Sequence, residues 1–129
     1  MSEAKIRPNK DQFIELMNTP DEGPVVMLNL LKFKARDGQA EYNKYGDSVI
    51  KMVESLGGKL LWLGKVDQAL IGPIDENDWD AIALVQYPSR KDFLEMVSTP
   101  EYEKAHEHRE SGLERTVLIA CTETVNRLG

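Results

Sequence analysis

The stretch from Val25 to Leu31 limits most strongly how this chain can fold. It reads Val-Val-Met-Leu-Asn-Leu-Leu, and its one polar side chain is Asn29. Successive side chains of a strand point to opposite faces of a sheet, so a strand over residues 25–34 is apolar on both faces. Both faces of the sheet that contains it must therefore be covered.

The segments around this strand follow a recognisable order. Helical spacing of apolar residues predicts helices over 10–18, over 40–56, and in two pieces from about 90 to 97 and from 100 to 110. Asn9, Ser89 and Thr99 are the expected N-caps of the first helix and of the last two pieces. Apolar stretches bounded by turn residues predict strands over 25–34, 59–66, 79–87 and 115–123. After the first helix the order is β-α-β-β-α-β, which is ferredoxin-like. Right-handed crossovers then place the main helices on one face of the sheet.

The other face of this sheet is left bare, although its strands are apolar there too. A second copy of the chain can cover it, sheet against sheet, and two-fold pairing is the commonest assembly. The helix over 10–18 could cover this face instead of a second copy, but a helix of about 9 residues shields only part of a four-stranded sheet. We expect an α+β, ferredoxin-like βαββαβ sandwich in a homodimeric α/β barrel. Residues 1–23 would form the N-terminal helix and loop, and residues 24–129 the main domain.

Charge and composition exclude several classes of partner. The 129 residues suit one domain, and 22 acidic against 16 basic side chains give a net charge of −6 without a basic cluster. We therefore expect no nucleic acid and no membrane as partners. The sequence has one cysteine, Cys121, no signal peptide and no apolar run of about 20 residues, so a cytoplasmic location is expected. Cys121 is expected to be a buried, inert thiol.

Familiar catalytic motifs are absent from the sequence. It contains no phosphate-binding glycine-rich loop, CxxC, HExxH or GxSxG pattern. The run His106-Glu107-His108 suggests a metal site, but residues two apart on a helix point to different sides and cannot share one ion. We expect neither a metal nor a cofactor.

One helical stripe carries side chains that could perform chemistry. Tyr102, Ala105, His106 and Arg109 share the expected inward face of the helix over 100–110. A histidine beside an arginine and a phenol can act as general acid or base, or bind an anion. Alternatively, His106 and Arg109 cap the edge of the core and reach solvent or a carboxylate.

Asn29 and the aromatic residues are further candidates. A buried amide must be hydrogen-bonded, so Asn29 either projects into a pocket and binds a ligand or bonds to neighbouring backbone or across the dimer. Trp62 and Tyr45 have spacings typical of core or interface residues, with cavity lining as the alternative.

Several short motifs within residues 24–123 resemble the domain-of-unknown-function family 1330. They are the run from Val26 to Phe33, Gly57-Gly58 before a strand, Tyr87-Pro88-Ser89-Arg90, Pro100-Glu101-Tyr102 shortly after Ser98, and His108-Arg109. The N-terminal helix and the long loop over 72–78 depart from short family members. The resemblance implies a dimeric α/β barrel but no assigned reaction. The wider superfamily is similar to cofactor-free monooxygenases, muconolactone isomerase-like enzymes, haem-dependent dye-decolorising proteins and stress-response barrels.

Three functional hypotheses follow. In the first, the barrel binds a small organic compound and acts as a cofactor-free oxygenase or isomerase. His106 and Asn29 would be catalytic, and Arg109, Trp62, Tyr45 and Tyr102 would bind the substrate. In the second, the protein is a non-catalytic dimeric stress-response or interaction module with a filled interior. In a third, the protein binds haem through a histidine ligand.

Overall fold

The doubly apolar strand lies inside a four-stranded antiparallel sheet, as a computed structural model shows for residues 7–20 and 23–128. In chain order the elements are α1 (Lys10–Asn18), β1 (Val25–Phe33), α2 (Gly38–Ser55), β2 (Lys59–Lys65), the short 3-10 helix η1 (Ile74–Glu76), β3 (Ala81–Tyr87), α3 (Arg90–Val97), α4 (Pro100–Gly112) and β4 (Leu113–Cys121). The strand order is β2-β3-β1-β4, with β1 and β3 in the centre. The predicted ferredoxin-like α+β fold is confirmed.

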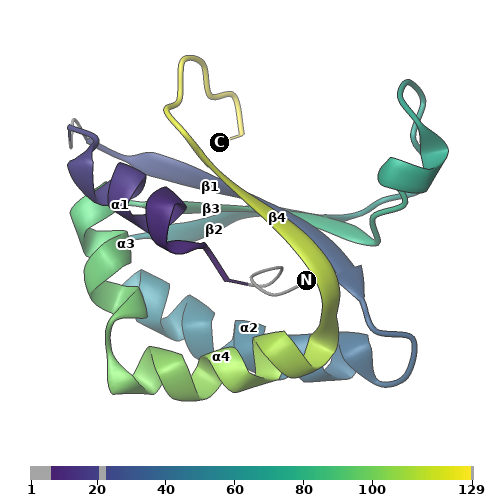
Figure 1. Ribbon diagram of the computed structural model, residues 1–129. Coiled ribbons are helices and arrows are strands. Elements are labelled where there is room, and N and C mark those ends of the chain that lie inside the picture. Colours follow the sequence, from purple (N-terminus) through teal and green to yellow (C-terminus); the bar gives the residue numbers. More distant parts are fainter. Residues whose placement is uncertain (1–6, 21–22, 129) are drawn as a thin grey trace.

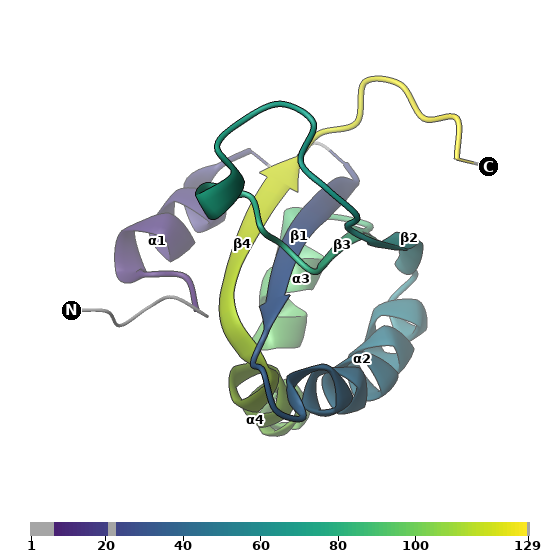
Figure 2. The same cartoon turned by 90° about the vertical axis from the view of Figure 1, so that its right-hand side faces the viewer.

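Helices cover one face of this sheet (Figures 1 and 2). On that face Val25 and Met27 of β1 pack into the main core with Val49 and Val53 of α2. The alternate residues of β1 point to the opposite face, over which no α-helix of the described residues lies. β1 is therefore apolar on both faces, as the sequence predicts, and a single copy covers only one of them.

The N-terminal helix does not cover the bare face. Asn9 caps it as predicted, because its side-chain oxygen accepts from the Gln12 backbone N–H at 2.8 Å while Gln12 bonds back to the Asn9 N–H at 3.0 Å. Beyond its cap, α1 lies beside α3, past the β4 edge of the sheet (Figure 2). A groove between these two helices is lined by Phe13, Leu16 and Leu94, among others.

The later helix boundaries also follow predicted turn chemistry. Ser89 accepts from the Asp92 backbone N–H at 3.0 Å, and Thr99 accepts from the Tyr102 N–H at 3.1 Å. α2 begins two residues earlier than predicted, after Asp37 adopts a left-handed conformation with φ of 59°. β4 likewise begins directly after α4 at Leu113, a fully buried residue, and not at residue 115.

Cys121 differs from its prediction. It is the last residue of β4 and is half-buried, not enclosed in the core. β4 is an edge strand, so its end lacks a neighbour on one side. Among the described residues, no helix is both long enough and apolar enough to cross a membrane.

Candidate functional site

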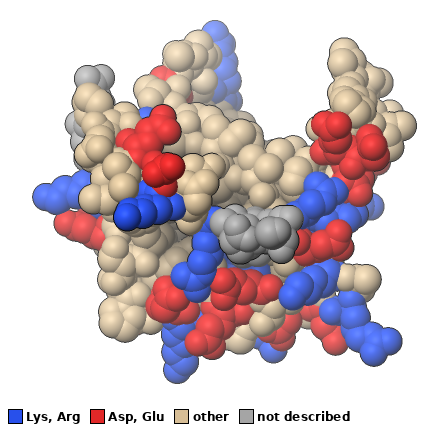
Figure 3. Space-filling model, in the orientation of Figure 1, with Lys and Arg blue, Asp and Glu red and all other residues tan. Residues whose placement is uncertain are grey.

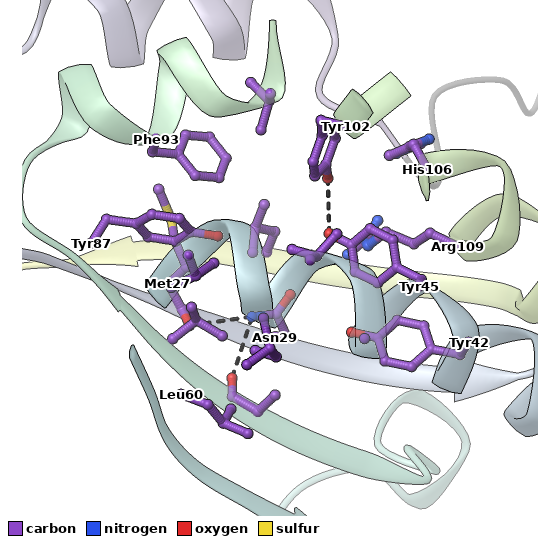
Figure 4. Close-up of a pocket in the computed structure, with 18 of the residues that line it drawn as sticks. Met27, Asn29, Tyr42, Tyr45, Leu60, Tyr87, Phe93, Tyr102, His106 and Arg109 are labelled. Atoms are coloured by element: carbon purple, nitrogen blue, oxygen red, sulfur yellow. Dashed lines mark hydrogen bonds between the residues drawn. The ribbon is translucent and has the colours of Figure 1, made fainter. Parts of the chain in front are cut away.

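A cavity of about 870 Å³ lies between the sheet and the helix layer (Figure 4). β1, β2 and β3 supply its floor, and α2 and α4 supply its roof. The floor residues are those that point toward the helices, and they include Met27, Leu60, Leu63, Ala83 and Val85. Most of this floor is apolar, so the few polar side chains that enter the cavity determine what it can bind.

Arg109 is a buried charged residue that lines the cavity. It comes from the inward stripe of α4 and is only 4% exposed. Its guanidinium carbon lies 5.7 Å from the ring centroid of Tyr45, within the range of a cation–π contact. Burial lowers the pKa of Arg109, but the oxygens of four surrounding tyrosines more than offset this, so its pKa lies above the ordinary value. Arg109 is therefore a permanent cation inside the pocket.

Tyrosines surround this cation. The hydroxyls of Tyr45 and Tyr102 are hydrogen-bonded at 2.8 Å (Figure 4), and the ring of Tyr42 packs against that of Tyr45 at 5.3 Å between centroids. Burial raises the pKa of all three phenols, and that of Tyr45 most clearly. They stay neutral at physiological pH. Two neutral hydroxyls share one hydrogen bond, so one of them keeps a proton that it can donate to another oxygen.

His106 lies one turn before Arg109 on α4 and is 5% exposed. Its Nδ1 is buried and has no hydrogen-bond partner among the described residues, although Glu110 Oε2 lies 3.8 Å away. Burial lowers the pKa of His106 to about 4, and the positive charges of Arg109 and Arg7 act in the same direction. The imidazole is therefore neutral near pH 7, with one ring nitrogen able to accept a proton.

Asn29 enters the cavity from the floor and is buried. Its Nδ2 donates to the carbonyl oxygens of Met27 and Ala83 at 3.2 and 3.3 Å (Figure 4). Two carbonyl acceptors fix which end of the amide is the NH₂ group, so the side-chain oxygen is the end directed toward the helix layer. The NH₂ group of Asn29 is thus hydrogen-bonded to neighbouring backbone, which was one of the two interpretations of this residue. Its side-chain oxygen faces the pocket.

Trp62 is separated from the other candidate residues. It is 47% exposed and pairs with Leu84 after an irregularity in the β2–β3 register between Leu60 and Trp62. Because of this β-bulge, Leu60 and Leu63 both face the cavity and Trp62 faces the bare side of the sheet. The structure thus brings together His106, Asn29, Arg109, Tyr45 and Tyr102, and not Trp62.

Three residues that were not predicted at this site also reach it, namely Arg7, Tyr42 and Tyr87. Tyr42 and Tyr87 line the cavity, and the helical spacing of Tyr42 to Tyr45 was the available signal for the first. Arg7 also lines the cavity, and it forms ion pairs with Glu103 at 2.9 Å and Glu110 at 2.6 Å. No local pattern predicts a contact between residues about 100 positions apart.

The two histidines of α4 point to different sides of the helix, as helical spacing predicts. His108 is much more exposed than His106, and its Nδ1 lies 3.1 Å from Glu41 on α2. Within residues 7–20 and 23–128, no group of three or more His, Cys, Asp or Glu side chains is placed to hold a metal ion. The buried polar groups of the cavity are a cation, a neutral imidazole, phenols and an amide oxygen. Further charged side chains also line it, namely Arg7, Asp47, Lys51, Glu54 and Glu103.

A βαββαβ sheet with helices on one face and a pocket between the layers defines a ferredoxin-like protein. The family model "Domain of unknown function (DUF1330)" matches residues 30–122, and the chain belongs to this family. None of the curated proteins compared with the chain matches it. The resemblance noted in the sequence is thus confirmed.

Solved structures give the same fold. A protein of unknown function from Rhodopseudomonas palustris is 35% identical with a TM-score of 0.84, over 94% of this chain and 98% of that one. A candidate antibiotic biosynthesis monooxygenase from Bacteroides thetaiotaomicron is 19% identical with a TM-score of 0.58, over 79% and 90%. A dimeric ferredoxin-like protein of unknown function from Jannaschia is 10% identical with a TM-score of 0.58, over 78% and 100%.

Proposed function

We propose that this protein binds a small organic anion in the cavity and moves a proton on it, as an isomerase or a cofactor-free oxygenase. One observation carries the proposal. The cavity of about 870 Å³ holds a buried guanidinium, Arg109, one helical turn from a buried neutral imidazole, His106. A permanent cation favours an anion, and a neutral imidazole can accept a proton.

Each polar group has a distinct role in this proposal. Arg109 binds a carboxylate or a developing enolate, because a guanidinium offers paired donors to such oxygens. The Tyr45–Tyr102 pair donates its remaining hydroxyl proton to the same region. The side-chain oxygen of Asn29 accepts a hydrogen bond from the ligand and orients it over the apolar floor.

His106 would take a proton from a C–H or O–H group of the bound compound, leaving an anion that Arg109 stabilises. Return of that proton at another atom gives isomerisation. Alternatively, the same carbanion transfers an electron to dissolved dioxygen and combines with the resulting superoxide to form a peroxide. The peroxide takes up the proton held by His106 and loses water, which leaves a carbonyl group on the substrate without the use of a cofactor. The candidate monooxygenase among the structural neighbours supports the second route at the level of fold alone.

Ligand binding can test the role of Arg109 directly. We expect benzoate and salicylate to bind the pocket and the uncharged benzamide to bind more weakly, as measured by calorimetry. Arg109→Met should weaken benzoate binding by about 10- to 100-fold, the usual value of a charge-assisted hydrogen bond. Arg36→Met is the matched control, because Arg36 is exposed and does not line the cavity.

A second readout covers the case in which Arg109→Met does not fold. In the wild-type protein, benzoate should shift the NMR resonances of the His106 ring and of Tyr45, and leave those of His108 unchanged. Equal affinity for benzoate and benzamide, or shifts confined to the surface, would contradict an anion site at Arg109.

A non-catalytic role is the second candidate, and the hydrogen bonds of Asn29 favour it. Backbone carbonyls satisfy its donor without any ligand, as expected of a structural residue. In that case the pocket variants would alter stability and leave every ligand response unchanged.

We also propose that the protein is a homodimer in which two bare sheet faces meet. The outward residues of the central strands are apolar, and they include Val26, Leu28 and Leu30 of β1 and Ile82 and Leu84 of β3. Sheets that are apolar on the inner side pack in this way in sandwiches and barrels. The dimeric descriptions of structural neighbours support this assembly.

A further inference from the structure

The connection between β2 and β3, residues 66–80, stands away from the rest of the molecule, and we call it the arm. It extends from the sheet on the side opposite α2 and α4, where Figures 1 and 2 both show it above the bare face. The C-terminal segment after β4 extends on the same side (Figure 1). The bare face is therefore flanked by two projections of the same chain.

The tip of the arm is apolar and exposed. Leu70, Ile71 and Ile74 are 85%, 91% and 77% exposed. Figure 3 shows uncharged atoms at the tip, above acidic side chains nearer the sheet. Single exposed apolar side chains are ordinary, but three together on one projection mark a contact surface.

The arm is nevertheless an ordered structure. At its base the Val66 N–H donates to the Asp80 carbonyl at 3.0 Å, and the Asp80 N–H donates to the Leu31 carbonyl at 2.8 Å. Near its tip the Asn77 side chain donates to the Pro73 carbonyl at 2.7 Å, beside η1. A preformed arm loses little conformational freedom when it binds, so its exposed tip is suited to a stable interface.

We propose that the arm clasps a second copy of this chain, with its apolar tip packed on the outside of the partner. This inference rests on the proposed face-to-face dimer and adds a second contact region to it. A partner seated on the bare face would lie beside the arm, because both are on the same side of the sheet. Two-fold symmetry would then give two equivalent arms, one from each protomer.

The arm's chemistry favours a protein partner over an anionic membrane. Asp67, Asp75, Glu76 and Asp78 lie within it and would repel anionic headgroups, while the apolar tip needs an apolar surface. A second copy seated on the bare face would bring its own apolar side chains to the side of the sheet from which the arm extends.

The test compares dimer affinity between two variants of the full chain by sedimentation equilibrium. Removal of the tip by Leu70→Ser, Ile71→Ser and Ile74→Ser should raise the dimer dissociation constant about tenfold or more, because burial of even one such side chain is worth about that factor. The control variant carries Ile14→Ser and Met17→Ser, which remove exposed apolar side chains from α1. Its dissociation constant should equal that of the wild type.

The possible results separate the two proposals. If the wild type is a dimer and the tip variant has the same affinity, the clasp is overturned and the face-to-face dimer stands. If the wild type is a monomer at all accessible concentrations, both are overturned. Neither result bears on anion binding in the cavity, which lies on the other side of the sheet.

A spin label gives an independent measurement. In a chain carrying Cys121→Ser and Ile71→Cys, a nitroxide on the new thiol is mixed with an isotope-labelled chain that has no nitroxide. Strong broadening confined to one region on the outside of the isotope-labelled chain supports the clasp, whereas broadening along the bare face is expected of the face-to-face dimer alone. The absence of such broadening in mixed dimers would overturn it.

Discussion

At the scale of single residues, His106 is the group whose properties depend most on its surroundings. Its pKa of about 4 is set first by burial and then by the positive charges of Arg109 and Arg7. In the unfolded chain the same imidazole titrates near 6.5. The folded protein thus binds fewer protons than the unfolded chain between these two values. Stability is complete above about pH 6.5 and declines as the pH falls toward 4.

This difference predicts how His106 contributes to acid unfolding. The full loss is at most about 3–4 kcal/mol, because each pH unit between about 4 and 6.5 is worth about 1.36 kcal/mol. In His106→Gln, the free energy of unfolding should change less between pH 6.5 and pH 4 than in the wild type, as measured by urea titrations at each pH. The wild type, measured in the same buffers, is the reference for this slope. A steep slope that survives in His106→Gln would disprove the assignment.

Most of the candidate residues predicted from residue patterns line the cavity, and the exception has a physical cause. Helical spacing placed Tyr102, His106 and Arg109 on the inward stripe of α4, where all three line the cavity. Trp62 was placed at the site from its strand position alone, but the bulge after Leu60 changes which residues face the helices. A bulge adds one residue without a distinctive local sequence, so alternation alone cannot reveal it.

At the scale of elements, the contact between the start of α2 and the end of α4 sets the roof of the pocket. A Cβ on Gly112 would lie 2.5 Å from the Gly38 carbonyl oxygen and 2.7 Å from the Tyr42 backbone nitrogen. Both are main-chain atoms that cannot rotate away. Glycine at 112 therefore lets α4 approach α2 closely enough to bring Arg109 beside the tyrosines.

Substitution of this glycine should be costly. We expect Gly112→Ala to lower the free energy of unfolding by about 1–3 kcal/mol, the usual range for overpacking. Gly46→Ala is the matched control on α2, because a Cβ there meets nothing within 4 Å. It should raise stability by about 0.5–1 kcal/mol, since alanine is the better helix former. Thermal unfolding measures both, and an unchanged midpoint for Gly112→Ala would show that the helices can separate without loss.

The order and type of the helices and strands could be predicted from the sequence because each depends mainly on residues that are close together in the chain. The caps at Asn9, Ser89 and Thr99 depend on residues within three positions, and all three were predicted. The position of α1 could not be predicted in the same way. Its packing beside α3 depends on contacts across about 80 residues, on which the periodicity of either helix gives no information.

At the scale of the whole molecule, the two faces of the sheet differ in what lies against them. The helix side holds the cavity with its few polar groups, and the bare side carries apolar residues most of which a single copy leaves partly exposed. Val117 and Ile119 of β4 extend this apolar face toward the sheet edge, and Ile119 is half exposed. Exposure of such a surface would be unfavourable in water, so a second sheet is the expected cover.

A charge in the middle of this face should therefore separate the copies without unfolding them. Leu84→Arg places a cation on the central strand β3 within the proposed interface, where it would lose its water and find no partner. Sedimentation velocity should change from the mass of a dimer to that of the 14.6 kDa chain, while circular dichroism keeps its α+β signature. Met17→Arg introduces the same charge on exposed α1 and should remain dimeric. If Leu84→Arg sediments as the wild type does, the copies do not meet through this face, and the apolar residues of the central strands must be covered in another way.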